Sequence, residues 1–140
     1  MKLSHLPLRL TTGAFILNSG VGKLQLEPEA AAGLQKMGAS AFPQVADLDP
    51  EQFGKVLSAV EIVLGSSLLL PFVPSRLAGL GLTAFSASMA TMYFKTPGMT
   101  RDDGLRPTQE GTVIAKDFWM LGIGLALILD SARKKKRKTT

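Results

Sequence analysis

The chain has 140 residues, 46% of them apolar, and it contains no cysteine. This length allows one domain, and the lack of cysteine excludes disulfides, thiolate catalysis and iron–sulfur ligation. The formal net charge is +5, but residues 133–138 supply six positive charges, which leaves −1 for the remainder. Nucleic-acid-binding domains spread their positive charge over one face, so we expect no nucleic-acid partner.

The first apolar segment runs from Leu6 to about Leu24 and is the least hydrophobic of four. Arg9 and Asn18 count against its insertion as an isolated helix. We predict a spanning helix that is shielded by its neighbours on one side, and the alternative is an amphipathic helix at the membrane surface or in solution.

A polar stretch follows, and within it Glu29 to Met37 consists of good helix formers. Pro28 suits the first turn of such a helix and Gly38 suits its end. Farther on, Asp49 precedes a proline and an acid, which is the pattern of an N-cap. We therefore predict a short helix, and then the start of a second spanning helix.

Val56 to Phe94 is apolar almost throughout, and its only charged residues are Glu61 and Arg76. As one continuous helix, at about 1.5 Å per residue, it would be nearly twice the roughly 30 Å of a bilayer's hydrocarbon core. Pro71 and Pro74 interrupt it. The sequence therefore predicts a transmembrane hairpin.

Small residues recur at a spacing of four in the second arm of this hairpin, at Gly79, Thr83, Ala87 and Thr91. Lipid supplies no hydrophobic force to join helices, so close approach along small residues is how such a helix packs. Packing within its own bundle is the preferred interpretation, and an oligomer interface is the alternative.

Lys95 to Thr112 is rich in turn formers and mixed charges and predicts a surface loop. The last apolar segment runs from about Ala115 to Asp130, and it is short for a span unless residues 113 and 114 join it. Trp119 lies near its start, as interfacial aromatic residues often do.

We predict an all-α integral membrane four-helix bundle, with spans at about 6–24, 53–73, 76–94 and 113–130 and a basic tail at 133–140. An even number of spans places both termini on one side, and the tail marks that side as cytoplasmic. The tail is also expected to contact anionic lipid headgroups, or else to act only as a topology anchor. Its basic residues are Arg133, Lys134, Lys135, Lys136, Arg137 and Lys138.

Charges within spans usually face the bundle interior, so they are the best pointers to function. Sorting by depth gives an inner layer of Arg9 and Asp130, and an outer layer that is a candidate pocket for a polar headgroup, a quinone-type ring or a small solute. The outer layer comprises Asn18, Lys23, Glu61, Lys116 and Asp117. We predict that Glu61 pairs with Lys23 or Lys116 and not with Arg9. The alternative is that these charges only fix helix register.

Several other motifs are incomplete. Residues 20–23, Gly-Val-Gly-Lys, lack the flanking residues of a phosphate-binding loop, because Leu17 and Leu24 stand at the required glycine and hydroxyl positions. His5 is the only histidine, so one chain cannot assemble a bis-histidine haem site or a multi-histidine metal site. We predict no catalytic residue, metal or cofactor.

Short motifs in the first, second and fourth spans resemble one known family. They are Arg9-Leu10 with Gly13 and Phe15-Ile16-Leu17, Glu61 with Gly65, and Ala115-Lys116-Asp117-Phe118-Trp119. In these the chain is similar to the DoxX family of small four-helix bacterial membrane proteins. It differs from many members in having Asn18 where they have histidine.

The resemblance implies a multi-pass protein of the bacterial plasma membrane and a place in membrane complexes linked to quinone-reducing sulfur oxidation or to oxidative-stress enzymes. Our first hypothesis is a non-catalytic accessory subunit of a respiratory or redox-linked membrane complex, with a membrane-protein partner or a second copy of the chain. The alternative is a quinone-contacting subunit of a membrane oxidoreductase. A small-solute carrier is the third hypothesis, and the apolar gap between Asn18 and Arg9 argues against it.

Overall fold

The computed structural model describes the backbone of residues 1–137 and the side chains as far as Ala132. Over these residues the chain forms five α-helices and two short 3₁₀ helices, with an isolated bridge between Thr100 and Pro107 as its only β pairing. The all-α prediction is confirmed. The elements are α1 (His5–Gly22), η1 (Lys23–Gln25), α2 (Pro28–Ala41), η2 (Pro43–Asp47), α3 (Pro50–Leu69), α4 (Ser75–Lys95) and α5 (Thr112–Arg137).

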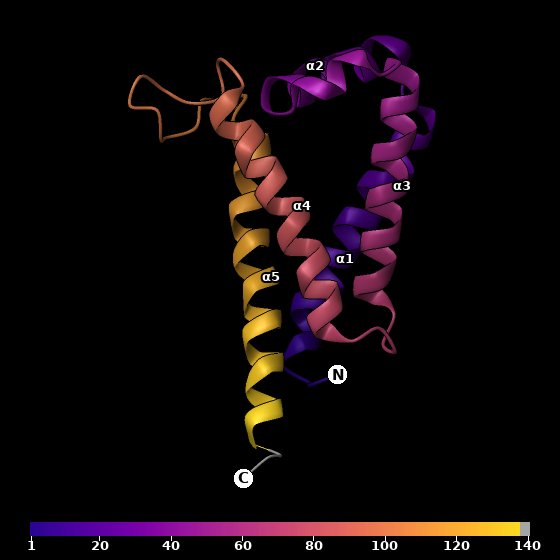
Figure 1. Ribbon diagram of the computed structural model, residues 1–140, viewed down its shortest axis with the longest axis vertical. Coiled ribbons are helices and arrows are strands. Elements are labelled where there is room, and N and C mark those ends of the chain that lie inside the picture. The colour runs from indigo at the N-terminus through magenta and orange to yellow at the C-terminus, as the bar shows by residue number, and fades with distance from the viewer. Residues whose placement is uncertain (138–140) are drawn as a thin grey trace.

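The four long helices are arranged as two antiparallel pairs (Figure 1). α1 packs along α3 and α4 packs along α5, whereas contacts between the pairs are few. The pairs approach each other at the end where the N-terminus and the α3–α4 turn lie, which we call the narrow end. They separate toward the opposite, wide end, where α2 lies across the gap and contacts both α3 and α4.

Glycine allows the close contact between α1 and α3. A Cβ atom at Gly65 would lie 2.5 Å from the backbone nitrogen of Leu17, and one at Gly20 would lie 2.9 Å from the Cβ of Glu61. The Ser58 hydroxyl donates a hydrogen bond of 2.7 Å to the Gly20 carbonyl across the same interface. Such close backbone approach is typical of helices that associate in membranes.

The second pair uses the same device. A Cβ at Gly124 of α5 would lie 2.5 Å from Thr83 Oγ1, and one at Gly79 of α4 would lie 2.9 Å from the Cβ of Leu127. The preferred interpretation of the small-residue stripe is therefore confirmed for its first half, which packs within the bundle. In its second half, Ala87 is exposed and Thr91 is half-buried.

One apolar core joins all four long helices. Its buried members are Ile16, Leu64, Leu68, Ala78, Leu82, Met120 and Leu127. Because lipid is as apolar as these side chains, the core contributes packing contacts more than a hydrophobic driving force. Within it, Leu68, Leu82 and Leu127 are 1% exposed or less.

The predicted hairpin is confirmed, since α3 ends at Leu69 and α4 begins at Ser75 after a short turn. The Asp49 N-cap is confirmed too, because its carboxylate accepts a hydrogen bond of 3.2 Å from the backbone N–H of Gln52. The predicted short helix is present, but its predicted end at Gly38 is wrong. Gly38 is buried beside the Phe53 ring and the helix continues to Ala41, so close packing is the use of this glycine.

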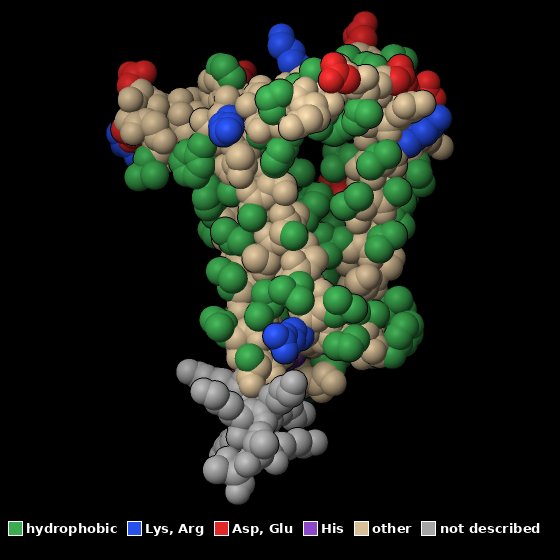
Figure 2. Space-filling model, in the orientation of Figure 1, with side chains coloured by type: hydrophobic (Ala, Val, Ile, Leu, Met, Phe, Trp, Pro, Cys, Tyr) green, Lys and Arg blue, Asp and Glu red, His purple; other side chains and the backbone are tan. Residues whose placement is uncertain are grey.

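Three helices are long and apolar enough to cross a membrane: Pro50–Leu69, Ser75–Lys95 and Thr112–Ala132. The last of these includes residues 113 and 114, which the sequence left open. Hydrophobic side chains cover the sides of these helices, and charged side chains gather at the ends (Figure 2). These features indicate a multi-pass membrane protein. α1 is not among the three candidates.

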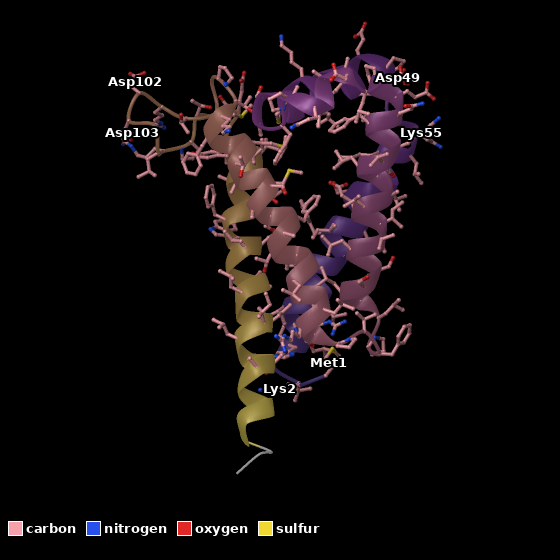
Figure 3. All side chains as sticks on the ribbon, viewed as in Figure 1. Met1, Lys2, Asp49, Lys55, Asp102 and Asp103 are labelled. Carbon is pink, nitrogen blue, oxygen red and sulfur yellow. The ribbon has the colours of Figure 1, made fainter. Side chains whose placement is uncertain are left out.

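Labelled charges mark the two ends clearly (Figure 3). Asp49, Lys55, Asp102 and Asp103 lie at the wide end, and Lys2 lies at the narrow end. Trp119 lies within α5 and is 77% exposed, so its ring faces outward and away from the helical pairs.

Candidate functional site

A cavity of about 310 Å³ lies between the two helical pairs toward their wide end. We call it the polar cavity, because Lys23, Glu61, Lys116 and Asp117 all line it. All five α-helices or their ends contribute to its lining, which is otherwise mostly aromatic and methionine-rich. These apolar residues include Phe15, Met37, Phe53, Phe85, Met89, Met92 and Met120. Sites for small molecules commonly have this composition, apolar walls with a few polar groups that converge.

Lys23 and Glu61 form the first ion pair of the polar cavity. Lys23 Nζ lies 2.9 Å from Glu61 Oε2 and donates a second hydrogen bond of 2.6 Å to Ser19 Oγ. Glu61 is 5% exposed. Because Gly20 has no side chain, α1 comes close enough to α3 for this pair to form. The prediction that Glu61 pairs with Lys23 or Lys116, and not with Arg9, is confirmed.

Lys116 and Asp117 form the second ion pair, with 3.0 Å between Lys116 Nζ and Asp117 Oδ2. The same ammonium group lies 5.4 Å from the centre of the Phe15 ring, in a cation–π contact. Asp117 is 1% exposed, yet its second oxygen, Oδ1, has no hydrogen-bond partner within the described part of the chain. A buried carboxylate oxygen that is left without a hydrogen-bond donor lowers the stability of the fold.

The four ionisable side chains contribute two positive and two negative charges, so the polar cavity is neutral overall. Burial of a net charge away from water is expensive. A charged occupant would therefore be disfavoured here. A neutral molecule that both donates and accepts hydrogen bonds matches the two ammonium groups and the two carboxylates that line the cavity.

The structure does not bring Asn18 into this group. Its side chain is exposed on α1, while Ser19, the next residue, lines the polar cavity. One residue along an α-helix turns the side chain by about 100°, so the two point in different directions. The spacing of four between Ser19 and Lys23 is the signal that could have identified Ser19.

Arg9 lies at the narrow end and is 1% exposed. Its guanidinium donates hydrogen bonds to the end of α3 and to the turn that follows. No described carboxylate forms an ion pair with it. Its hydrogen bonds, of 2.7 to 3.0 Å, go to the carbonyl oxygens of Ser67, Leu68, Leu70 and Val73 and to Ser75 Oγ. The last carbonyl groups of a helix lack partners within the helix, and a guanidinium has five N–H donors that can supply them. This contact joins α1 to the α3–α4 turn.

Asp130, the other member of the predicted inner layer, also lies at the narrow end but does not pair with Arg9. Its Oδ2 atom is 2.7 Å from Lys2 Nζ and 2.7 Å from His5 Nε2. Its side chain is 42% exposed. The inner layer thus consists of two separate contacts: Arg9 joins α1 to the α3–α4 turn, and Asp130 joins α5 to the start of α1.

The predicted lipid-headgroup contacts involve the side chains of Arg133, Lys134, Lys135, Lys136, Arg137 and Lys138, which lie outside the described side chains. They stay a prediction. Among the described residues, no three histidine, aspartate or glutamate side chains converge as a metal site would require. Comparison with protein-family models, with curated proteins and with solved structures finds no match to this chain.

Proposed function

We propose that this protein crosses the bacterial plasma membrane four times, with both termini in the cytoplasm, and holds a neutral ring of the quinone or quinol class in the polar cavity. In this role it acts as an accessory subunit of a membrane oxidoreductase. The observation that carries the proposal is that two ion pairs converge on one cavity with apolar walls. A ring hydroxyl can donate to the carboxylate of Glu61 or Asp117, while a ring oxygen can accept from Lys23 or Lys116.

The four-span topology rests on α1 as well as on the three more apolar helices. α1 has 18 residues, which is about 27 Å of helix and close to the thickness of a bilayer core. Arg9 is buried against α3, whereas Leu10, Phe15 and Val21 are about half exposed and suit contact with lipid. Pairing with α3 shields Arg9, the one Lys, Arg, Asp or Glu side chain of α1, as insertion requires.

The accessory role rests on residue types. The chain has one histidine and no cysteine, so it lacks the usual ligands for a redox centre of its own. Electrons that enter or leave a bound ring would therefore pass to a partner subunit that carries such a centre. The resemblance to the DoxX family supports this role, because the motif residues Glu61 and Lys116-Asp117 line the polar cavity.

Two other functions have less support. If the ion pairs only fixed helix register, they would be expected to lie in closed packing, whereas all four of their side chains border the polar cavity. A solute carrier needs a continuous polar path, and the buried core around Leu68, Leu82 and Leu127 closes the interior between the polar cavity and Arg9.

The test is binding of a tailless hydroquinone, trimethylhydroquinone, to the purified protein by isothermal titration calorimetry in mild detergent. We expect saturable binding by the wild type and about tenfold weaker binding by Asp117→Asn, because a hydrogen bond to a charged group contributes about 1.5–3 kcal/mol. Asp102→Asn, an identical substitution in the exposed loop, is the matched control and should bind as the wild type does. No binding by the wild type, or equal binding by Asp117→Asn, would refute the proposal.

A further inference from the structure

A second, larger hollow lies on the surface of the molecule between α3 and α4. Its volume is about 700 Å³, and we call it the lateral groove. Small residues make up much of its wall, among them Ala59, Ala78, Gly81 and Ala84. Figure 2 views the face on which α3 and α4 lie side by side. The groove faces outward from two candidate spans, so it opens toward lipid.

The lateral groove offers no free polar group. Its two hydroxyl-bearing residues, Ser67 and Ser88, donate to carbonyl oxygens of their own helices, to Val63 at 2.7 Å and to Ala84 at 2.9 Å. The rest of its lining is apolar. With every hydroxyl already bonded, the groove matches an occupant that has no polar atoms of its own.

The lateral groove and the polar cavity meet at one side chain. Phe85 of α4 lines both of them and is half-buried. α3 and α4 make few contacts with each other along their length, so only side chains separate the interior from the groove at this point. If the Phe85 ring turns aside, a molecule with its polar end beside Glu61 and Asp117 can extend into the groove.

We propose that the lateral groove holds the hydrocarbon tail of the ring that the polar cavity binds, so that the ligand is a tailed quinone or quinol that lies partly inside the protein and partly in the groove. This inference rests on the proposed function. The position of Phe85 as the shared wall selects a tail over a helix of a partner or of a second copy, because a helix packed in the groove would hold the Phe85 ring in place and keep the two hollows apart. Since lipid is as apolar as the groove, the groove contributes a path for the tail more than it contributes affinity.

The test compares tailless and tailed rings on variants of α4 in lipid nanodiscs of phosphatidylethanolamine and phosphatidylglycerol. Ala84 and Ala87 are both exposed on α4, but only Ala84 lines the lateral groove. Ala84→Leu should weaken binding of a ring with four isoprene units by about tenfold or more, because the tail then has no path. It should leave binding of trimethylhydroquinone unchanged, and the matched control Ala87→Leu should leave both unchanged.

The outcomes separate the two proposals. Absence of trimethylhydroquinone binding by the wild type contradicts the proposed function itself. Equal weakening of both ligands by Ala84→Leu, or no effect on either, overturns the tail site alone. A change from dimer to monomer in Ala84→Leu, measured by light scattering, would assign the groove to a second copy and also overturn it.

A second measurement uses the wild-type protein, so it does not depend on correct folding of Ala84→Leu. A tailed ring that carries a diazirine on its first isoprene unit should crosslink to the peptide that contains Ala84 and Phe85 in the wild-type protein. Excess tailless ring should reduce this labelling, because it occupies the same cavity. Labelling that spreads evenly over the exposed faces of α3, α4 and α5 would overturn the tail site.

Discussion

The narrow and wide ends of this molecule both bury charged side chains, but they do so in opposite ways. At the narrow end, Arg9 gives its donors to four carbonyl oxygens and Ser75 Oγ. At the wide end, Lys23, Glu61, Lys116 and Asp117 border about 310 Å³ of space. A buried charge that bonds only to the protein stabilises the fold, whereas charges that border a cavity are available to a ligand.

Removal of Arg9 should have the largest effect. Arg9→Gln would leave several buried carbonyl groups without donors, each at a cost of about 1–3 kcal/mol, so we expect the free energy of unfolding to fall by roughly 3 kcal/mol or more. Thermal unfolding in detergent, followed by circular dichroism, measures this. Arg76→Gln is the matched control, since Arg76 is exposed near the same turn. Equal stability of the two variants would show that the narrow end is not held by Arg9.

Crowding at the helix interfaces should be next in size. Gly65→Ala places a Cβ atom 2.5 Å from the Leu17 nitrogen, and overpacking of this kind typically costs about 1–3 kcal/mol. Gly122→Ala on α5 meets nothing within 4 Å, and it should be neutral or slightly stabilising because alanine favours helix. The difference in melting temperature between the two variants is the measurement. If Gly65→Ala were as stable as Gly122→Ala, close contact between α1 and α3 would not be needed.

Loss of the Glu61 charge should affect binding more than folding. In Glu61→Gln, Lys23 at the end of α1 can move its ammonium group toward water, so we expect the protein level to stay near that of the wild type. Binding of trimethylhydroquinone should weaken by about tenfold, because a charged acceptor is replaced by a neutral one. Turnover of the host complex should fall with it. A large drop in protein level instead would show that the charge of Glu61 has a structural role, as the charge of Arg9 does.

The smallest effect is expected on the stability of the exposed loop between α4 and α5, which contains none of the buried charges of either end. The side-chain hydrogen bond from Arg106 lowers the pKa of Asp103, and the backbone N–H groups of Leu105 and Arg106 lower it further. Because the folded pKa lies below the unfolded one, this stabilisation is present above the unfolded pKa and is lost as the pH falls through the folded pKa. Hydrogen exchange at Leu105 and Arg106, corrected for the intrinsic rate, should therefore show less protection in acid, and Asp103→Asn should remove this pH dependence.

Local patterns in the sequence predicted much of the fold. Two prolines located the α3–α4 turn, and the Asp49-Pro50 pair located the start of α3. The depth of Glu61 along its helix was enough to limit its partner to Lys23 or Lys116 and to exclude Arg9, because the rise per residue is nearly constant in helices. These features depend on residues that are close in the chain or on simple geometry.

Other features depend on which helix packs against which, and periodicity does not encode this. The separation of the bundle into two pairs and the cavity between them could not be predicted for that reason. The role of Arg9 was hidden because its partners are backbone carbonyl groups, which every residue carries. The sequence predicts Asn18 as a residue of the pocket, but Ser19 lines the polar cavity instead. Depth along a helix does not fix the direction in which a side chain points.

The outward-facing indole of Trp119 provides an internal depth gauge. It is the only tryptophan in the chain, so its fluorescence reports a single position. It stands two residues after Asp117 on the same helix, about 3 Å farther along the axis. Quenching of its emission by lipids brominated at known carbons would therefore measure how far below the headgroups the ion pairs are located.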